Sequence, residues 1–307
     1  MTESMYKLNA TVRPTGAING QAVRLAWSEA RPAVQVIFQL RLLTGALVGA
    51  GALADVSWGA MAAGAAAWLL LTWSTYLLNG AADVVEDQSN GSTRPIARGD
   101  LDALTGGRLA TLLGAAGLSL SAVVSERFFL LALLLSVLSW AYSTGPAPLK
   151  NTVAGVQVTV VGAGLLTYLA GINVAGGSLT ETVLVLAVAM SAWMGIGGLA
   201  KDLSDVAGDR AAGRHTLPLL WGERGARLAI ATAATVVGTA FLTAALTLAP
   251  GLLPVAGLVL AGSLVLAAVA LGRWSEGDRA ARRRPYRIFM ITQYAAHLTI
   301  LLQLVLR

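Results

Sequence analysis

The 307-residue chain contains no cysteine, and only 12% of its residues are charged. The lack of cysteine excludes disulfide bonds, thiolate metal sites and a cysteine nucleophile. The scarcity of charge, together with 56% hydrophobic residues and a mean hydropathy of +0.68, excludes the soluble classes and indicates an integral membrane protein. No long polar stretch separates the apolar runs, so no separate soluble domain is expected.

Nine apolar runs in the sequence each come close to the ~20 residues that cross a hydrocarbon core. Backbone polar groups cannot face lipid unpaired, and the runs do not alternate in period two, so they are predicted to be helices. They cover residues 34–54, 59–79, 104–124, 127–143, 152–173, 180–199, 227–248, 251–271 and 286–306. The predicted fold class is an all-α membrane protein with nine transmembrane helices.

Lysine and arginine gather in alternate loops between these runs. Placing the N-terminus in the cytoplasm leaves only Arg127 and Arg307 of the 22 basic residues outside, as the positive-inside rule requires. Residues 1–33 then form a cytoplasmic segment with a short surface helix near 21–29 and without the apolar core of a cleavable signal peptide. Residues 34–307 form a single transmembrane domain of the cell membrane. The net charge of +6 favours anionic lipid headgroups as partners and not nucleic acid, because the basic residues lie beside membrane helices.

Two acidic clusters stand where apolar runs end, and both face the cytoplasm in this topology. Each cluster places its polar side chains on about one face of a helix, at spacings i, i+4, i+8 and i, i+3, i+7. Mg²⁺ prefers hard oxygen ligands and completes its coordination with water and substrate phosphate. The clusters therefore predict a magnesium–diphosphate site. Their members are Asn79, Asp83 and Asp87 in the first cluster and Asp202, Asp205 and Asp209 in the second.

Basic residues accompany both clusters, and a bound diphosphate needs such cations beyond the metal. They are Arg94 and Arg98 after the first cluster and Lys201, Arg210 and Arg214 around the second. The alternative is that the acidic residues only keep helix ends in water. The recurrence of the pattern four spans apart favours the metal site, and it suggests two pseudo-repeated four-helix halves followed by a ninth helix.

These motifs together resemble the UbiA superfamily of intramembrane prenyltransferases. The stretch 79–99, with Arg94-Pro95, is similar to the family's first aspartate motif and its following loop. The stretch 201–217 resembles the second motif of the homogentisate and chlorophyll-type members. The stretch 142–150 and the opening Arg31-Pro32 match as well. Two departures are Gly80, where many members carry aspartate, and Gly91, where lysine is usual.

The resemblance implies nine helices around a central cavity capped by cytoplasmic loops, and transfer of an isoprenoid from its diphosphate with Mg²⁺ as cofactor. It also implies roles for single residues. Asn79, Asp83 and Asp87 would hold one Mg²⁺, and Asp202, Asp205 and Asp209 the other. Arg94, Lys150 and Lys201 would contact the diphosphate, and Tyr142 would line the pocket near the reacting carbon.

Three functions are compatible with the sequence. The first is a prenyltransferase, in which the metal stabilises the leaving diphosphate and an aromatic or quinone-precursor acceptor captures the allylic cation. The second is a terpene cyclase, in which the prenyl chain's own alkene attacks. The third is a transporter, which is disfavoured because the carboxylates lie at helix ends and not at the bilayer midplane.

Arg41 is the one basic residue deep inside the first apolar run, where a lone charge is costly unless it faces a cavity or snorkels. A cavity role, in recognising an acidic acceptor or a phosphate, and snorkelling both stay open. His215 and His297 are expected to form hydrogen bonds in a loop and in the last span, and not to bind metal or act as a base.

Overall fold

The computed structural model describes residues 17–51 and 56–306, and this part of the chain is helical with no strand. Nine helical segments within it are long and apolar enough to cross a membrane, which confirms the predicted number of spans. Residues 1–16, the last three residues of the first predicted span and Arg307 lie outside the described residues. The α-helices are α1 (Gly20–Glu29), α2 (Pro32–Ala50), α3 (Trp58–Ala82), α4 (Val84–Ser89), α5 (Pro95–Arg98), α6 (Ala103–Val124), α7 (Glu126–Ser143), α8 (Val153–Val174), α9 (Glu181–Ala211), α10 (Leu217–Thr247), α11 (Leu253–Leu271), α12 (Arg279–Arg282) and α13 (Arg284–Val305).

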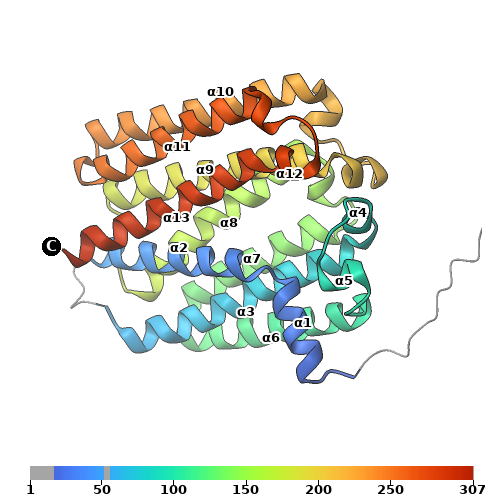
Figure 1. Ribbon diagram of the computed structural model, residues 1–307. Coiled ribbons are helices and arrows are strands. Elements are labelled where there is room, and N and C mark those ends of the chain that lie inside the picture. Colours follow the sequence, from blue (N-terminus) through green and yellow to red (C-terminus); the bar gives the residue numbers. More distant parts are fainter. Residues whose placement is uncertain (1–16, 52–55, 307) are drawn as a thin grey trace, which may run out of the picture.

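The long helices run side by side, and α4 and α5 lie together at one end of the bundle (Figure 1). Among the long helices, α2 packs against α8, α3 against α6, α8 against α9, and α10 against α11. α13 closes the arrangement by contacting α2, α9 and α11. The division into two four-helix halves and the cytoplasmic position of the N-terminus stay predictions.

Local sequence signals explain where several helices begin. Ser125 ends α6 and caps α7, because its hydroxyl accepts a hydrogen bond from the Phe128 backbone N–H at 3.1 Å. Arg31 separates α1 from α2 with a left-handed backbone (φ 56°), an uncommon conformation for a residue with a side chain. Pro32 follows at the first position of α2, where its missing N–H costs no hydrogen bond.

The helices that carry the acidic clusters differ from the predicted spans. α9 continues through 31 residues, so the second cluster lies on an unbroken helix and not beyond its end. The first cluster is interrupted: α3 ends at Ala82, Asp83 leaves the helical conformation (φ −106°, ψ 22°), and α4 begins at Val84. The stripe expected along one continuous helix from Asn79 to Asp87 therefore bends at Asp83.

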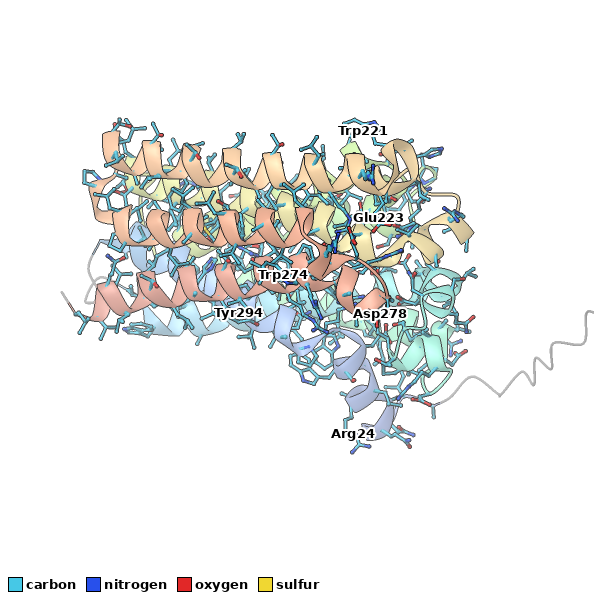
Figure 2. The ribbon with its side chains drawn as sticks, turned by 45° about the horizontal axis from the view of Figure 1, so that its top comes forward. Arg24, Trp221, Glu223, Trp274, Asp278 and Tyr294 are labelled. Atoms are coloured by element: carbon cyan, nitrogen blue, oxygen red, sulfur yellow. The ribbon has the colours of Figure 1, made fainter. Side chains whose placement is uncertain are left out.

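The predicted surface helix near residues 21–29 is confirmed as α1, and it is docked on the bundle. Ala22 and Ala26 are buried with Leu77 of α3 and Ile96 of α5. The Trp73 indole N–H donates to the Ala26 carbonyl oxygen at 3.1 Å. Arg24, in the middle of α1, is exposed and points away from the bundle (Figure 2). This docking brings the last residue of α1 to the first acidic cluster.

Candidate active site

One cavity contains both acidic clusters. It is formed by α2, α3, α4, α7, α8, α9 and α13, and the loop residues between them. The clusters line what we call its cluster end. Arg41, ten residues beyond Arg31 and thus about 15 Å further along α2, lines its inner end together with Phe38 and Gln293. The predicted site residues that line the cavity are Asn79, Asp83, Asp87, Tyr142, Lys150, Lys201, Asp202, Asp205, Asp209 and Arg41.

Asp83 is the centre of the first cluster and is only 8% exposed. It accepts hydrogen bonds from the Asn79 amide at 2.9 Å and the Arg214 guanidinium at 2.8 Å. The Lys150 ammonium forms a further ion pair with it. Arg214 also reaches Glu86 at 2.9 Å and Asp209 of the second cluster at 3.4 Å. Arg214 is therefore the cation that links the two clusters.

A short backbone pairing brings Lys150 and Arg214 together. The His215 N–H donates to the Asn151 carbonyl oxygen at 2.8 Å, and Thr152 pairs with His215 as an isolated bridge. The loop after α9 is thereby joined to the loop before α8. Because Lys150 and Arg214 are next to the paired residues, both side chains are directed to the same Asp83 carboxylate. This bond involves the backbone of His215, so the predicted hydrogen bond of its side chain stays a prediction.

These contacts fix the charge states outside the membrane-spanning helices. Burial opposes ionisation of Asp83, but Arg214 and Lys150 outweigh burial and hold the pKa of Asp83 below its ordinary value of 3.8. Burial likewise opposes the charge of Arg214, but the combined attraction of Asp83 and its other neighbours, including Asp209 and Glu86, raises the pKa of Arg214. Asp83 and Arg214 are therefore ionised at neutral pH.

Asp87 is held by Arg94, and Arg94 is held by a residue that the motifs did not indicate. The Arg94 guanidinium contacts the Asp87 carboxylate at 2.7 Å and the fully buried Glu29 carboxylate at 2.7 Å. It also donates to the backbone oxygens of Glu29 and Tyr76, both at 3.1 Å. The other Glu29 oxygen accepts from the Ile96 N–H at 2.9 Å. Arg94 thus directs its donors to protein groups behind Asp87.

The glycine at position 80 is explained by the same contacts. A Cβ at Gly80 would lie 2.2 Å from a Glu29 carboxylate oxygen and 2.7 Å from the Arg94 guanidinium. The space beside Asn79 is therefore filled by the carboxylate that α1 brings. Burial raises the pKa of Glu29 above its ordinary value, against the opposing effect of Arg94.

The second cluster has fewer partners than the first. Asp205 pairs with Lys201 at 2.6 Å on its own helix and with Arg279 at 3.1 Å. Asp202 is 8% exposed and has no hydrogen bond or ion pair with any described residue. One oxygen of Asp209, Oδ2, is buried without a hydrogen-bond partner in the described chain. Two carboxylates of α9 are therefore left without a full counter-charge.

A close approach of α4 to α9 joins the clusters. The Gly208 N–H donates to the Asn90 side-chain oxygen at 2.8 Å. A Cβ at Gly208 would lie 2.2 Å from the Asn90 amide nitrogen and 2.5 Å from the Glu86 carbonyl oxygen. Only glycine fits at this contact without a shift of the backbone, so Gly208 sets the distance between the two acidic clusters.

The donor set fits Mg²⁺ bound together with a diphosphate. Among the residues that the structure describes, no three histidines or carboxylates converge closely enough to hold a metal by themselves. Mg²⁺ usually takes one or two protein carboxylates and fills its other positions with water and substrate phosphate. Asp202 and the unpartnered oxygen of Asp209 supply hard oxygen ligands at the same end of the cavity as Asp83.

The inner end of the cavity has a different chemistry. Arg41 is 1% exposed, and its Nη2 donates to the Gln293 side-chain oxygen at 3.1 Å. The His297 ring bonds the Gln293 backbone oxygen at 2.6 Å through Nδ1 and the Tyr168 hydroxyl at 2.7 Å through Nε2. With the proton on Nδ1, Nε2 accepts from Tyr168, so His297 is a neutral hydrogen-bonded residue as predicted.

Two predicted substrate contacts do not line the cavity. Arg94 lies behind Asp87, and Arg210 is exposed on the outer face of α9. Their contact with substrate stays a prediction. Two cavity or support residues, Arg31 and Glu29, were not assigned a role from the sequence, and Arg214 was indicated only as a cation near the second cluster. The positive charge of Arg214 near the second motif was visible, but its role as a link, and that of Glu29, depended on contacts between distant segments.

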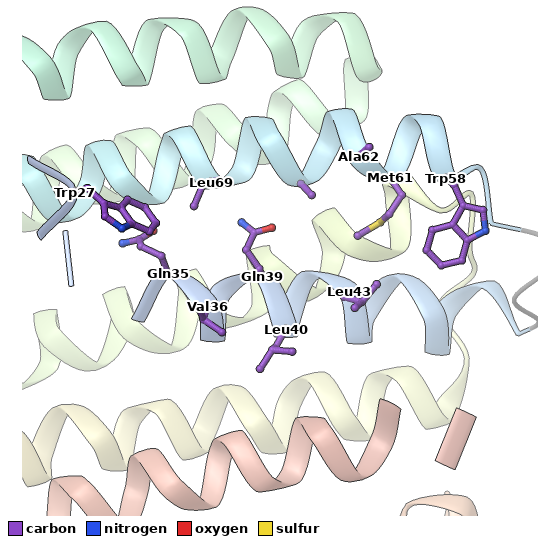
Figure 3. A pocket seen from close by; sticks show the side chains of 11 residues that line it. Trp27, Gln35, Val36, Gln39, Leu40, Leu43, Trp58, Met61, Ala62 and Leu69 are labelled. Atoms are coloured by element: carbon purple, nitrogen blue, oxygen red, sulfur yellow. The ribbon is translucent and has the colours of Figure 1, made fainter. Parts of the chain in front are cut away.

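A second pocket, separate from the cavity, lies between α2 and α3. Figure 3 shows Gln35 and Gln39 of α2 between Trp27 at one end and Trp58 at the other. The remaining lining is mostly aliphatic and includes Leu69. None of the carboxylates of the two clusters reaches it, so the acidic site belongs to the other cavity.

The amino-acid sequence is similar to known membrane prenyltransferases. The sequence pattern of the UbiA prenyltransferase family matches residues 42–292. A digeranylgeranylglyceryl phosphate synthase of Thermococcus gammatolerans is 30% identical over 149 residues, which cover 48% of this chain and 51% of that protein. The match thus spans about half the length of that relative.

Solved structures are similar over most of the chain. A UbiA homologue from Archaeoglobus fulgidus bound to GPP and Mg²⁺ has a TM-score of 0.69 at 17% identity, covering 89% of this chain and 99% of that one. A digeranylgeranylglyceryl phosphate synthase structure has a TM-score of 0.65 at 14% identity, covering 93% and 99%. At these identities the likeness establishes the fold. The resemblance of the second motif to the homogentisate and chlorophyll-type branch gains no support from these relatives.

Proposed function

Because the chain belongs to the UbiA prenyltransferase family, we propose that it is a Mg²⁺-dependent intramembrane prenyltransferase. It ionises a prenyl diphosphate at the cluster end of the cavity and transfers the prenyl group to an acceptor. Family membership favours this enzyme over the transporter that the sequence left open.

The observation that carries the proposal is the joining of two acidic clusters at one end of a single cavity. Gly208 and Arg214 hold α4 and the end of α9 together there. Lys150 and Lys201 add positive charge from two further positions. Carboxylates for a metal and cations for a diphosphate in the same place are what ionisation of a prenyl diphosphate requires.

The reaction breaks the bond between C1 of the prenyl group and the diphosphate oxygen, and the electron pair leaves with the diphosphate. When bound to the carboxylates of both clusters, Mg²⁺ supplies a Lewis acid that neutralises the leaving group. Lys150, Lys201 and Arg214 exchange a carboxylate partner for a diphosphate oxygen and stabilise the charge that builds there. The acceptor's electron pair forms the new bond to C1, and its proton passes to the released diphosphate.

Apolar side chains between the two ends protect the cationic intermediate from water. Val156, Val160 and Ala163 of α8 and Met194 of α9 line this part of the cavity. Exclusion of water prevents capture of the allylic cation before the acceptor reacts. Tyr142 lines the cavity from α7, and its ring face can stabilise a cation.

The sequence favoured an aromatic or quinone-precursor acceptor, whereas the name of the Thermococcus gammatolerans relative points to a glyceryl phosphate. Either acceptor meets the same ionised prenyl group. A cyclase, which uses no acceptor, shares the ionisation step. We place the protein in the cell membrane with the cluster end facing the cytoplasm, because that orientation keeps nearly all lysine and arginine inside.

The test uses full-length protein in detergent with geranyl, farnesyl or geranylgeranyl diphosphate and Mg²⁺. Release of diphosphate that stops with a chelator and returns with Mg²⁺ supports the proposal. Asp202→Asn should lack this activity, and the matched control Asp100→Asn, which changes an exposed partner of Arg98, should retain it. Products identified by mass, with and without acceptors, separate a transferase from a cyclase. Absence of metal-dependent diphosphate release from all three substrates would refute the proposal.

A further inference from the structure

Arg41 lies at the inner end of the cavity, far from any carboxylate of the two clusters. It occupies the tenth position of α2, a helix of 19 residues, and is 1% exposed. Its side chain cannot reach either end of the helix to meet water, because it starts about 14 Å from each. Snorkelling, which the sequence left open, is therefore incompatible with this position, and the side chain lines the cavity instead.

All the neighbours of the Arg41 guanidinium are neutral. Its Nη2 donates to Gln293, the Tyr168 hydroxyl interacts with it, and the Phe38 ring centroid lies 5.2 Å from its central carbon. Within the described residues it forms no ion pair, and its Nε and Nη1 atoms are buried without a hydrogen-bond partner. The network with Gln293, Tyr168 and His297 therefore orients the guanidinium but leaves its positive charge uncompensated.

An uncompensated charge at this depth is costly, and it would repel a prenyl cation formed in the same cavity. A cavity that only folded and cyclised a prenyl cation would gain nothing from such a residue. An anion bound beside Arg41 removes both difficulties, since it neutralises the guanidinium and supplies acceptors to its free donors. The leaving diphosphate does not fill this role, because the metal ligands and the other cations lie at the cluster end.

We propose that Arg41 binds an oxyanion, a carboxylate or a phosphate, on the acceptor. This inference rests on the proposed prenyltransferase function and makes Arg41 a specificity-determining residue for the second substrate. The oxyanion lies at the inner end, and the nucleophilic atom of the acceptor points toward the cluster end. Anionic acceptors are therefore selected over neutral ones of the same shape.

Binding of small probes to the full-length protein tests this inference without knowledge of the natural acceptor. The probes are 4-hydroxybenzoate, its neutral counterpart 4-hydroxybenzamide, and glycerol 1-phosphate. We expect one of the two anions to bind saturably and to raise the melting temperature, and the amide to bind more than about 30-fold more weakly. Which anion binds distinguishes a carboxylate from a phosphate acceptor. Equal binding of the acid and the amide, with no binding of the phosphate, would overturn the inference.

Two variants separate recognition from structure. Arg41→Gln should lose the preference for the anion, and its ligand-free melting temperature should be unchanged or higher, because a buried unpaired charge is removed. Arg108→Gln, at an exposed arginine of α6 outside the cavity, should keep the preference. An Arg41→Gln protein that melts lower yet binds the anion as tightly as before would show that Arg41 only ties α2 to α13, and the inference would be wrong.

Diphosphate release tests the proposed prenyltransferase function separately from the role of Arg41. Protein that releases diphosphate with Mg²⁺ and transfers the prenyl group only to neutral acceptors, or only cyclises it, would refute the role of Arg41 and leave the ionisation chemistry intact. Protein that binds the anionic probe through Arg41 without releasing diphosphate would refute the prenyltransferase. With both activities present, Arg41→Gln should raise the KM for the anionic acceptor and not that for the prenyl diphosphate.

Discussion

The two acidic clusters contain similar residues but differ in how fully protein cations compensate their charge. In the first cluster, Asp83 is surrounded by Lys150 and Arg214, and Asp87 is bound by Arg94. In the second cluster, Asp202 has no partner among the described residues and Asp209 has one oxygen unpartnered. The ion pairs of the first cluster thus help to hold the cavity together, in addition to the proposed role of its carboxylates in binding the metal. The second is open to a metal and its substrate.

The cause of the difference is local backbone geometry. The helix that carries the first cluster breaks at Asp83, and the loops before α8 and after α9 deliver cations to the break. The second cluster stays on the continuous helix α9, where Lys201 and Arg279 both pair with Asp205, Arg214 contacts Asp209, and no cation pairs with Asp202 among the described residues. Two acidic motifs that look alike in the sequence can therefore differ in how far protein cations compensate their charge, and substitutions in each cluster should differ accordingly.

Removal of the metal should have the largest effect. With a chelator, turnover should fall to background, and a prenyl diphosphate should no longer raise the melting temperature, because the unpartnered carboxylates would repel it. At a ligand concentration of about 100 times Kd, the lost stabilisation is about 2.7 kcal/mol. Diphosphate release assays and melting curves, each with Mg²⁺ added back, measure this. Stabilisation that persists without metal would show that the cations alone bind the substrate.

Asp202→Asn should have the second-largest effect. It should lower kcat roughly 100-fold to 1,000-fold, because it removes a charged oxygen ligand needed as the leaving group forms. Its ligand-free stability should be unchanged or slightly higher, since Asp202 has no partner to lose. Steady-state kinetics and thermal melting in the same detergent give both numbers. A strongly destabilised Asp202→Asn protein would contradict the open state of the second cluster.

Asp83→Asn should lower activity and should also lower the free energy of unfolding by about 3 kcal/mol, because it leaves the buried Lys150 without its carboxylate and removes one of the three carboxylates that Arg214 contacts. The pKa of Asp83 is below 3.8 in the folded protein, so this contribution is present above pH 3.8 and is lost as the pH falls through the lowered pKa. The free energy of unfolding of the wild-type and Asp83→Asn proteins, measured over this pH range, should differ less as the pH falls. A stability gap that widens at low pH would rule out the proposed ion pairs.

Gly208→Ala should cost roughly 1–3 kcal/mol, because the added methyl group would press on Asn90 and the Glu86 carbonyl and move α4 from α9. Activity should fall further than stability alone explains, since the distance between the clusters changes. Gly107→Ala is a suitable control, because nothing lies within 4 Å of the added atom there. Equal kinetics of the two variants would mean that the clusters act independently.

Arg210→Ala should have the smallest effect, below about twofold on kcat/KM, since this residue is exposed and absent from the cavity lining. Arg94→Ala should be clearly worse, because it frees Asp87 and leaves Glu29 buried without its cation. Measuring kcat/KM of both variants under the same conditions shows whether the ion pair of Arg94 with Asp87 contributes more to catalysis than the position of Arg210 beside the second cluster. A larger loss in Arg210→Ala would restore its predicted contact with the diphosphate.

The amino-acid sequence by itself determined the nine apolar helical segments and marked the residues of the two acidic clusters. Apolar runs of membrane-spanning length are sufficient to define nine helices, because lipid allows no other backbone that satisfies its own hydrogen bonds. The short-range spacing of Asp83, Asp202 and their neighbours was enough to mark the acidic clusters. Lys150 was indicated only by the resemblance of residues 142–150 to the family; it lines the cavity beside Asp83, and its contact with the diphosphate stays a prediction.

Only the tertiary structure decided which charges are compensated. Glu29 reaches Arg94 across 65 residues, and Arg214 reaches Asp83 across 131. Arg41 is distinguished by the lack of a counter-ion in the described chain, which no local pattern can reveal. Pairing depends on which distant side chains a fold brings within a few ångströms. That information resides in the packing of α1, α2, α4, α9 and α13, and not in any one motif.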